Sequence, residues 1–174
     1  MESSAAPSSK LLVSACLLGE AVRYDGRAKP LPGDALQDLC AAGRVVAFCP
    51  EVAGGLPVPR APAEIVGSGG DAVIDGNAVV ITASGEDVSE HFLAGAQRAL
   101  ALCREQRIAV AVLTERSPSC GSGETYDGSF SRSTRNASGV TTALLRRHGV
   151  RVFNQYQLDA AIDCLVRPPQ ARDL

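Results

Sequence analysis

The sequence has few aromatic residues, little net charge and no long apolar run. Aromatic residues make up 4% of the 174 residues and apolar residues 45%, so we expect a core built from Ala, Val, Leu and Ile. A formal net charge of −2 argues against a nucleic-acid-binding surface that depends on bulk charge, and we predict no DNA partner. No apolar run is long enough to span a bilayer, which predicts no membrane partner.

The first ten residues lack the basic and apolar regions of a signal peptide. We expect residues 1–9 to be a disordered leader, residues 10–166 to form a single α/β domain, and residues 167–174 to be a disordered tail. The chain is predicted to be cytoplasmic, where disulfides are rare. Its six cysteines therefore favour metal binding, catalysis or core packing over crosslinks.

Alternating strand and helix patterns predict a mostly parallel sheet with helices on both faces. Apolar runs predict buried strands at residues 11–15, 45–48, 108–113 and 150–153. Apolar residues at helical spacing predict helices near residues 34–43, 87–103, 140–149 and 158–165. The long helix is expected to begin with a capping box at residues 87–90.

Two segments do not follow this alternation. Residues 72–81 are predicted to form a small β-hairpin insertion, with Asp75 and Gly76 at its turn. Residues 114–138 form a polar stretch rich in Gly and Ser. A connection of this length in a compact domain is usually functional.

Three of the six cysteines lie at or beyond the ends of predicted parallel strands, namely Cys16, Cys49 and Cys120. The carboxyl ends of such strands line one edge of the sheet, where open α/β sheets bind ligands. Three thiols that are far apart in the sequence can therefore converge on one site. Without a fourth partner they suggest a metal centre with one open position. The alternative for each is buried packing at a strand end.

The remaining cysteines and His148 have simpler explanations. Cys40 and Cys103 fall on the apolar stripes of predicted helices, and Cys164 lies beside one, which favours inert packing. His148 near a helix end is explained by the helix dipole. Structural zinc usually has four protein ligands, often in close pairs, and the sequence has no C-x-x-C pair.

Five separated motifs resemble, in the same order, those of the thiouracil desulfidase family, long catalogued as a domain of unknown function. They are VSACLLG at 13–19, RYDG at 23–26, CPEVAGGLPVPR at 49–60, SPSCG at 117–121 and YDGSF at 126–130. The similarity extends from about Lys10 to about Asn154. It implies a single Rossmann-like domain that carries a 4Fe–4S cluster on Cys16, Cys49 and Cys120.

The resemblance also implies an activity, the non-redox removal of sulfur from a thiolated pyrimidine with release of hydrosulfide. The substrate sulfur would bind the open iron, which acts as a Lewis acid. Glu51 would take a proton from the attacking water, and Ser117 would orient the base. Two alternatives remain open: another 4Fe–4S lyase that activates a hydroxyl, and a non-enzymatic iron–sulfur or zinc sensor.

The predicted partner is a small thiopyrimidine, such as thiouracil or a thiouridine nucleotide, bound by a monomer or a homodimer. Arginines and backbone N–H groups within residues 122–138 suit a phosphate. The candidates for substrate contacts are Arg23, Tyr24, Gly54, Gly55, Arg60, Ser119, Tyr126, Arg132 and Arg135. For the loop residues the alternative is a solvated lid, and Arg60 could instead anchor its own loop.

Overall fold

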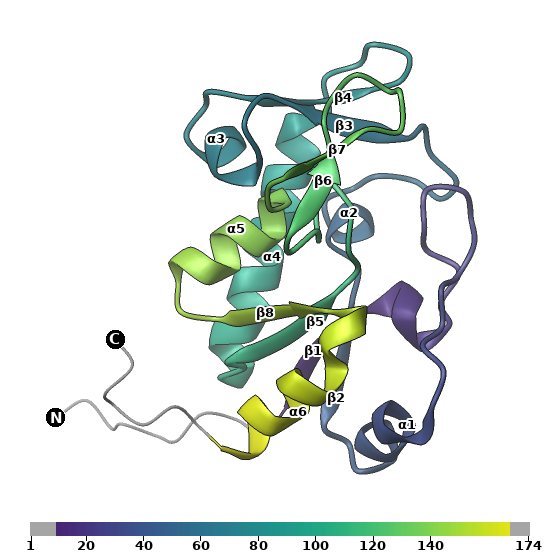
Figure 1. Ribbon diagram of the computed structural model, residues 1–174, viewed down its shortest axis with the longest axis vertical. Helices are drawn as coiled ribbons and strands as arrows, with labels where there is room; N and C mark the ends of the chain where they lie inside the picture. Colours follow the sequence, from purple (N-terminus) through teal and green to yellow (C-terminus); the bar gives the residue numbers. More distant parts are fainter. Residues whose placement is uncertain (1–9, 168–174) are drawn as a thin grey trace, which may run out of the picture.

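The computed structural model describes residues 10–167, and its centre is a four-stranded sheet in the order β2-β1-β5-β8 (Figure 1). All neighbouring strands in this sheet are parallel, which confirms the predicted α/β class. Its strands are β1 (Leu11–Ser14), β2 (Val45–Phe48), β5 (Val110–Leu113) and β8 (Arg151–Asn154). The predicted leader, and all of the predicted tail beyond Arg167, lie outside the described residues.

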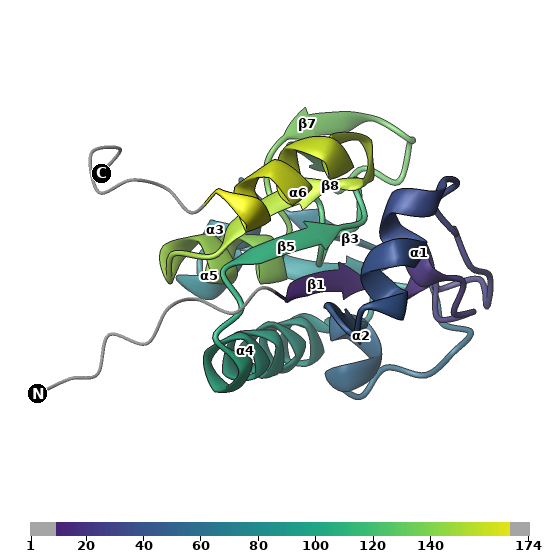
Figure 2. The ribbon, with the colours of Figure 1, turned by 90° about the horizontal axis from the view of Figure 1, so that it is seen from below.

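Helices cover both faces of the sheet, and Figure 2 shows the sheet between α4 and α6. One face carries α4 (Ser89–Gln106) and α5 (Val140–Arg147), and the other carries α1 (Asp34–Ala41) and α6 (Leu158–Val166). Side chains alternate along β1, so that Leu12 shares a core cluster with Leu100 of α4, whereas Leu11 and Val13 share the other cluster with Leu36 of α1. The sheet is therefore buried on both sides, as its continuous apolar strands predict.

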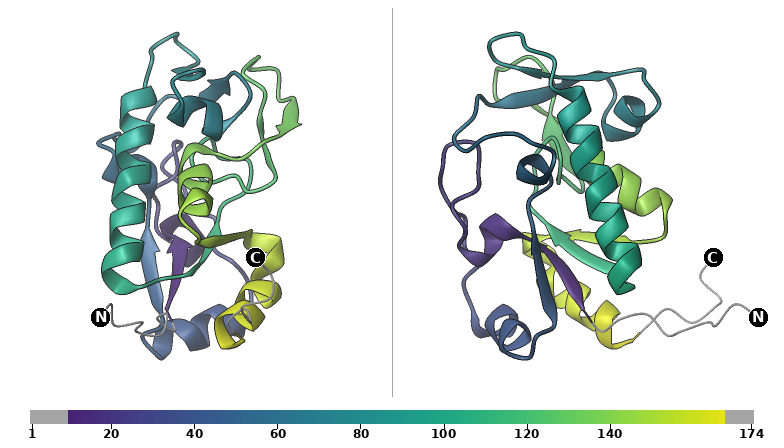
Figure 3. Two further views of the ribbon diagram at one scale, coloured as in Figure 1. Left: turned by 90° about the vertical axis from the view of Figure 1, so that its left-hand side faces the viewer. Right: turned by 180° about the vertical axis from the view of Figure 1, so that it is seen from behind.

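Two antiparallel ribbons lie at one end of the molecule, beyond the sheet (Figure 1 and Figure 3). They consist of β3 (Ala63–Val66) with β4 (Val79–Thr82), and β6 (Glu124–Tyr126) with β7 (Thr134–Asn136). Ile65 and Val80 of the first ribbon share a core cluster with Phe92 of α4 and Val140 of α5. The ribbon therefore extends the hydrophobic core past the end of the sheet.

The predicted hairpin over residues 72–81 is wrong in its first strand. Residues 72–74 belong to the helix α3 (Gly70–Ile74), and β4 pairs with β3 instead. A Cβ on Gly70 would lie 2.3 Å from the carbonyl oxygen of Gly139, so this glycine lets α3 pack closely on the start of α5. Val73 is buried there. Tertiary packing thus overrides the β propensity of this segment.

Two further segments differ from the prediction. The helix α4 begins without the predicted capping box: its N-cap is Val88, and Asp87 Oδ1 accepts from the N–H of Ser89, at 2.9 Å. Ser89 Oγ accepts a hydrogen bond from the backbone N–H of Val80, 2.8 Å away, and ties the helix to β4. The polar stretch 114–138 is not irregular throughout, because it contains β6 and β7. Within residues 10–167, no helix combines the length and apolar character needed to cross a membrane.

The strand order places a crevice at the carboxyl ends of the central strands. From β1 the chain moves to β2 on one side and then crosses to β5 on the other, which makes the β1/β5 boundary a switch point. The carboxyl ends of β1 and β5 are joined directly, since the backbone N–H of Thr114 donates a hydrogen bond to Ser14 Oγ at 3.0 Å. Short helical turns follow three of the strands: η1 (Ala15–Leu18), α2 (Pro50–Ala53) and η2 (Gln155–Gln157).

Candidate active site

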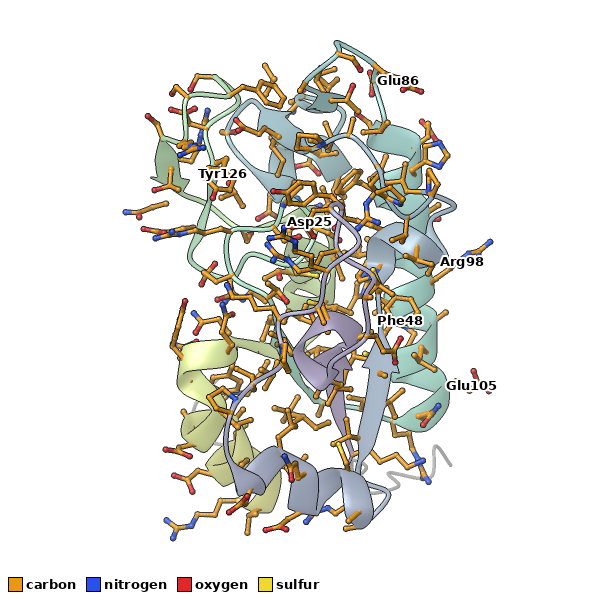
Figure 4. All side chains as sticks on the ribbon, turned by 90° about the vertical axis from the view of Figure 1, so that its right-hand side faces the viewer. Asp25, Phe48, Glu86, Arg98, Glu105 and Tyr126 are labelled. Carbon is orange, nitrogen blue, oxygen red and sulfur yellow. The ribbon has the colours of Figure 1, made fainter. Side chains whose placement is uncertain are left out.

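A cavity of about 640 Å³ lies at the carboxyl ends of β1, β2 and β5. Phe48, at the end of β2, contributes to its wall, and so does Tyr126 of β6 (Figure 4). The sheet end supplies residues Ser14, Ala15, Cys16, Phe48, Cys49, Pro50, Glu51, Thr114, Glu115, Arg116, Ser117, Pro118 and Cys120. The opposite wall includes residues of both ribbons, namely Ala63, Glu64, Tyr126, Phe130 and Arg132. The cavity is thus enclosed by segments that are far apart in the sequence.

The three cysteines predicted to converge all line this cavity. Cys16 and Cys120 are buried, and Cys49 is half-buried at the N-cap of α2. Cys16 Sγ lies 3.0 Å from Thr114 Oγ1, and the Ser14 hydroxyl donates to Cys120 Sγ at 3.7 Å. The sheet edge therefore brings together thiols from three separate motifs.

The other three cysteines lie elsewhere. Cys103 is buried in the core between α4 and the sheet, as predicted, and burial raises its pKa to about 11. Cys164 is half-buried and packs against the core cluster on the opposite face. The prediction that Cys40 is packed in the core is wrong, because this residue is exposed on α1. None of the three lines the cavity.

The donor set of the cavity fits an iron–sulfur cluster. Each thiolate ligand of such a cluster binds a different iron, so the ligands need to surround a cavity and do not need to meet at one atom. In the described part of the chain, no His, Cys, Asp or Glu side chains form a group of three that could hold a metal ion together. Burial raises the pKa of Cys120 and of Cys49 above the ordinary value, which favours neutral thiols in the absence of a cation. A coordinated metal deprotonates such thiols.

Glu51 lines the cavity from the first turn of α2, two residues after Cys49. Arg60 Nε lies 3.4 Å from Glu51 Oε1, and the side chain of Arg60 is only 6% exposed. The guanidinium group is fixed by two more hydrogen bonds, to the carbonyl oxygens of Pro57 and Val22, each 3.1 Å long. Burial raises the pKa of Glu51, and the positive charge of Arg60 offsets part of this rise. The site thus holds a carboxyl group that is suited to proton transfer.

Close packing of α2 on α4 sets the position of Cys49 and Glu51. A Cβ on Gly95 of α4 would lie 2.0 Å from the carbonyl oxygen of Pro50, and a Cβ on Gly54 would lie 2.0 Å from that of His91. Only glycine permits this approach at either position. Sequence reasoning missed the role of Gly95, because nothing in its local pattern distinguishes it from other helical residues.

Ser117 lies in a tight turn that carries Cys120. Its Oγ accepts hydrogen bonds from the backbone N–H groups of Ser119 and Cys120, both at 3.1 Å. The N-terminus of α5 supports this turn, since the N–H of Val140 donates to the carbonyl oxygen of Pro118. The first N–H groups of a helix have no partner inside the helix, and the turn supplies one. Two accepted bonds leave the hydroxyl hydrogen of Ser117 as the group that can bind a further partner.

Glu115 organises the same segment from the other side. Its carboxylate accepts hydrogen bonds from the backbone N–H groups of residues 116, 122, 123 and 124, from the Ser122 hydroxyl and from the Asn154 side chain. Burial raises the pKa of Glu115, but these hydrogen bonds outweigh it and hold the pKa below its ordinary value. Sequence reasoning missed this residue, although it lies only two positions before Ser117.

The cavity wall carries more positive than negative charge that is free to act on a ligand. Arg60 pairs with Glu51, and Arg116 pairs with Glu124. Three other cations line the cavity and form no ion pair with any described residue: Arg23, Lys29 and Arg132. Two lining carboxylates, of Glu64 and Glu115, also form no ion pair within residues 10–167 and accept hydrogen bonds from backbone N–H groups instead, so the lining keeps an excess of positive charge. An excess of positive charge around a concave site favours an anionic ligand.

The structure divides the nine predicted substrate contacts into two groups. Those that line the cavity are Arg23, Tyr24, Arg60, Tyr126 and Arg132, and those that do not are Gly54, Gly55, Ser119 and Arg135. Ser119 is fully buried and its hydroxyl pairs with Thr141 of α5 at 3.0 Å. Arg135 donates to the carbonyl oxygens of Gly67 and Asp127. These two side chains therefore lie outside the cavity and connect the segments that form its wall.

Comparison with known proteins finds relatives over most of the chain. The model of the 2-thiouracil desulfurase family matches residues 11–157. The uncharacterized protein YbbK of Bacillus subtilis (strain 168) is 43% identical over 149 residues, which cover 86% of this chain and 97% of YbbK. A solved structure of the 4Fe–4S-dependent thiouracil desulfidase TudS is 50% identical with a TM-score of 0.83, and the match covers 90% of this chain and 97% of that one. All five motifs lie within the residues that the family model matches.

Proposed function

The chain belongs to the 2-thiouracil desulfurase family and is an enzyme, and we propose that it replaces the sulfur of a thiolated pyrimidine with oxygen from water. The reaction consumes one water and releases hydrosulfide and a proton, so no electron is gained or lost. One observation carries the proposal: the thiols of three motifs share a single cavity with Glu51 and Ser117.

Cys16, Cys49 and Cys120 are the residues that would hold a 4Fe–4S cluster, the cofactor of the desulfidase TudS. When bound through three thiolates, such a cluster supplies an iron with an open position, a thiophilic Lewis acid that polarises a C=S bond. Ser14 and Thr114 contact two of these sulfur atoms and would orient them. Cys103, also buried, lies outside the cavity and takes no part.

Glu51 is the proposed general base. Arg60 holds Oε1, and within residues 10–167 no hydrogen bond engages Oε2, so the second oxygen is available to a water molecule in the cavity. Taking a proton from that water makes its oxygen a better nucleophile toward the thiocarbonyl carbon. The same carboxyl group can then return the proton to a ring nitrogen or to the departing sulfur.

Ser117 is proposed to orient the pyrimidine by donating a hydrogen bond. Because its Oγ already accepts from the N–H groups of Ser119 and Cys120, the hydroxyl hydrogen is the group left to meet the substrate. The two accepted bonds also polarise the hydroxyl and strengthen it as a donor. This role differs from that of a nucleophile, which would need a base within hydrogen-bond reach.

The excess of positive charge in the cavity lining favours a nucleotide over a free base. Arg23, Lys29 and Arg132 line the cavity without an ion-pair partner among the described residues. A phosphate group can bind to several such cations at once, whereas an uncharged pyrimidine cannot. We therefore infer that a thiouridine monophosphate is a better substrate than thiouracil. The predicted monomer or homodimer and the predicted cytoplasmic location stay predictions.

The test is turnover by protein that has been reconstituted with iron and sulfide without air. We expect loss of thiocarbonyl absorbance together with release of one sulfide per substrate from 4-thiouridine 5′-monophosphate, and slower release from 4-thiouracil. The corresponding 2-thio compounds establish which position is attacked. Absence of sulfide release from every thiopyrimidine in protein with full cluster content would refute the proposal and favour a different Lewis-acid lyase.

A further inference from the structure

The loop between β6 and β7, residues 127–133, carries two residues with unusual backbone conformation at the cavity. Phe130 and Arg132 have φ angles of 56° and 65°, and both line the cavity. Residues other than glycine rarely adopt this left-handed conformation, and it persists only where the surroundings impose it. The contacts that impose it here therefore decide where these two side chains lie.

Glu64 of β3 provides the central contact. Its Oε2 accepts hydrogen bonds from the backbone N–H groups of Gly128 at 2.9 Å and Phe130 at 3.1 Å. Glu64 is only 8% exposed and itself lines the cavity. Hydrogen bonds to a carboxylate are stronger than those between neutral groups. Glu64 thus fixes the backbone at Gly128 and at Phe130, which lies two residues before Arg132.

Two more contacts dock the loop on the first ribbon. A Cβ on Gly128 would lie 2.8 Å from the carbonyl oxygen of Ile65, so the backbone of the loop approaches β3 closely. Arg135 joins the start of the loop to the end of β3 through the carbonyl oxygens of Asp127 and Gly67. The loop therefore has one defined position relative to the cavity, and the carboxylate of Glu64 lies at the centre of these contacts.

We propose that Glu64 is a positioning residue for the substrate: by fixing the 127–133 loop it holds the guanidinium group of Arg132 at the cavity and so sets the affinity for the anionic part of a nucleotide. This inference rests on the proposed function, in which Arg132 is one of the cations that meet the phosphate. Glu64 acts through the loop, whereas Glu51 and Ser117 belong to the sheet end of the cavity. We therefore expect an effect on KM and not on kcat.

The test compares wild type, Glu64→Gln and Arg132→Gln as cluster-loaded enzymes. The substrates are 4-thiouridine 5′-monophosphate, which carries a phosphate, and 4-thiouracil, which does not. Glu64→Gln removes the charge at nearly constant size, and we expect KM for the nucleotide to rise about tenfold while kcat changes less than about twofold. For the free base, kcat/KM is expected to stay within about twofold of wild type.

The double variant separates an effect through Arg132 from a general disturbance. If Glu64 acts by placing Arg132, then Glu64→Gln in the Arg132→Gln background raises the nucleotide KM by less than about twofold further. If the two residues contributed independently, the factors by which the two substitutions raise the nucleotide KM would multiply. Multiplied effects, or an equal loss on the free base, would overturn the inference.

A binding measurement gives a readout that does not depend on turnover. Uridine 5′-monophosphate is titrated calorimetrically into the cluster-loaded protein, and we expect Glu64→Gln to weaken its binding by about tenfold. Glu105→Gln is the matched control, because Glu105 is exposed and points away from the molecule on α4 (Figure 4). If Glu64→Gln does not fold, Glu64→Asp replaces it, since it keeps the charge but is one methylene too short to reach both N–H groups.

The possible failures are distinguishable. A wild-type enzyme that releases sulfide from neither substrate refutes the proposed function. A wild-type enzyme that accepts the free base but not the nucleotide refutes the anion-binding role of Arg132 and with it this inference. A wild-type enzyme that turns over the nucleotide, together with an unchanged KM and an unchanged calorimetric affinity in Glu64→Gln, refutes the role of Glu64 alone.

Discussion

Cys16 Sγ lies 3.0 Å from Thr114 Oγ1, at the point where β1 and β5 end side by side. The contact joins two residues that are 98 positions apart in the sequence. It exists because parallel neighbours bring their carboxyl ends to the same edge of the sheet. On the same edge Ser14 Oγ accepts from the N–H of Thr114 and donates to Cys120 Sγ, so two of the three cavity thiols are tied to one pair of strand ends.

The three-thiol assignment predicts a selective loss of iron. We expect Cys16→Ser, Cys49→Ser and Cys120→Ser each to reduce cluster content strongly after anaerobic reconstitution, because each removes one of three thiolate ligands. Cys40→Ser is the control, since Cys40 is exposed and distant from the cavity lining. Iron and acid-labile sulfide analysis measures the result. A Cys120→Ala protein with full cluster content would contradict the assignment.

Substitution of the two proposed catalytic residues should lower the turnover of each assembled cluster. We expect Glu51→Gln to lower kcat by about 10²–10⁴-fold, the usual contribution of general acid–base catalysis. Ser117→Ala should lower kcat less, because the bond that it removes from the substrate only orients the pyrimidine. This variant also removes the acceptor of the Ser119 and Cys120 N–H groups, so its kcat is expressed per assembled cluster. The visible absorbance of the cluster serves as the check on assembly.

The matched control for Glu51→Gln is Glu86→Gln, because Glu86 is exposed at the ribbon end of the molecule (Figure 4). This variant makes the same change of charge and should keep wild-type kcat. A Glu51→Gln enzyme with normal cluster absorbance and normal kcat would exclude Glu51 as the base.

The Glu115 network predicts a pH-dependent contribution to stability. The folded-state pKa of Glu115 is lowered, so its contribution is present above the unfolded-state pKa of about 4.3 and is lost as the pH falls through the folded-state pKa. We expect Glu115→Gln to lower the free energy of unfolding at pH 7, and the difference from wild type to shrink toward pH 3. Urea denaturation across this range measures it, with exposed Glu20→Gln as the control. A difference that grows as the pH falls would contradict the assignment.

The close approach of α2 to α4 predicts that Gly95 tolerates no side chain. In Gly95→Ala the added Cβ would lie 2.0 Å from the carbonyl oxygen of Pro50, so α2 must move. We expect a loss of about 1–3 kcal/mol in the free energy of unfolding, as for overpacked cores. Cluster content should also fall, because α2 follows Cys49 directly. Gly123→Ala is the control, since its Cβ meets nothing closer than 3.7 Å. Wild-type stability in Gly95→Ala would contradict this account of the packing.

Prediction from the sequence succeeded for elements with a strong local pattern and failed where distant contacts decide. The strands β1, β2, β5 and β8 were recognisable because buried parallel strands are continuous apolar runs. The β propensity of residues 72–74 predicts a strand, but packing against α5 makes them helical. The spacing of Cys40 predicts a core position, but this residue is exposed on α1.

The sequence by itself determined the chemistry that this protein has available: three thiols at strand ends, a carboxylate beside one of them, a serine beside another, and motifs that resemble one family. Only the tertiary structure decided which polar residues face the cavity. Arg132 reaches the cavity because Glu64 of β3 holds the 127–133 loop through the N–H of Phe130, which is 66 positions later in the sequence. The hydroxyl of Ser119 instead pairs with Thr141 of α5. The physical reason is that periodicity reports which face of an element is apolar, while orientation within a site depends on hydrogen bonds and close contacts between segments that are distant in the sequence.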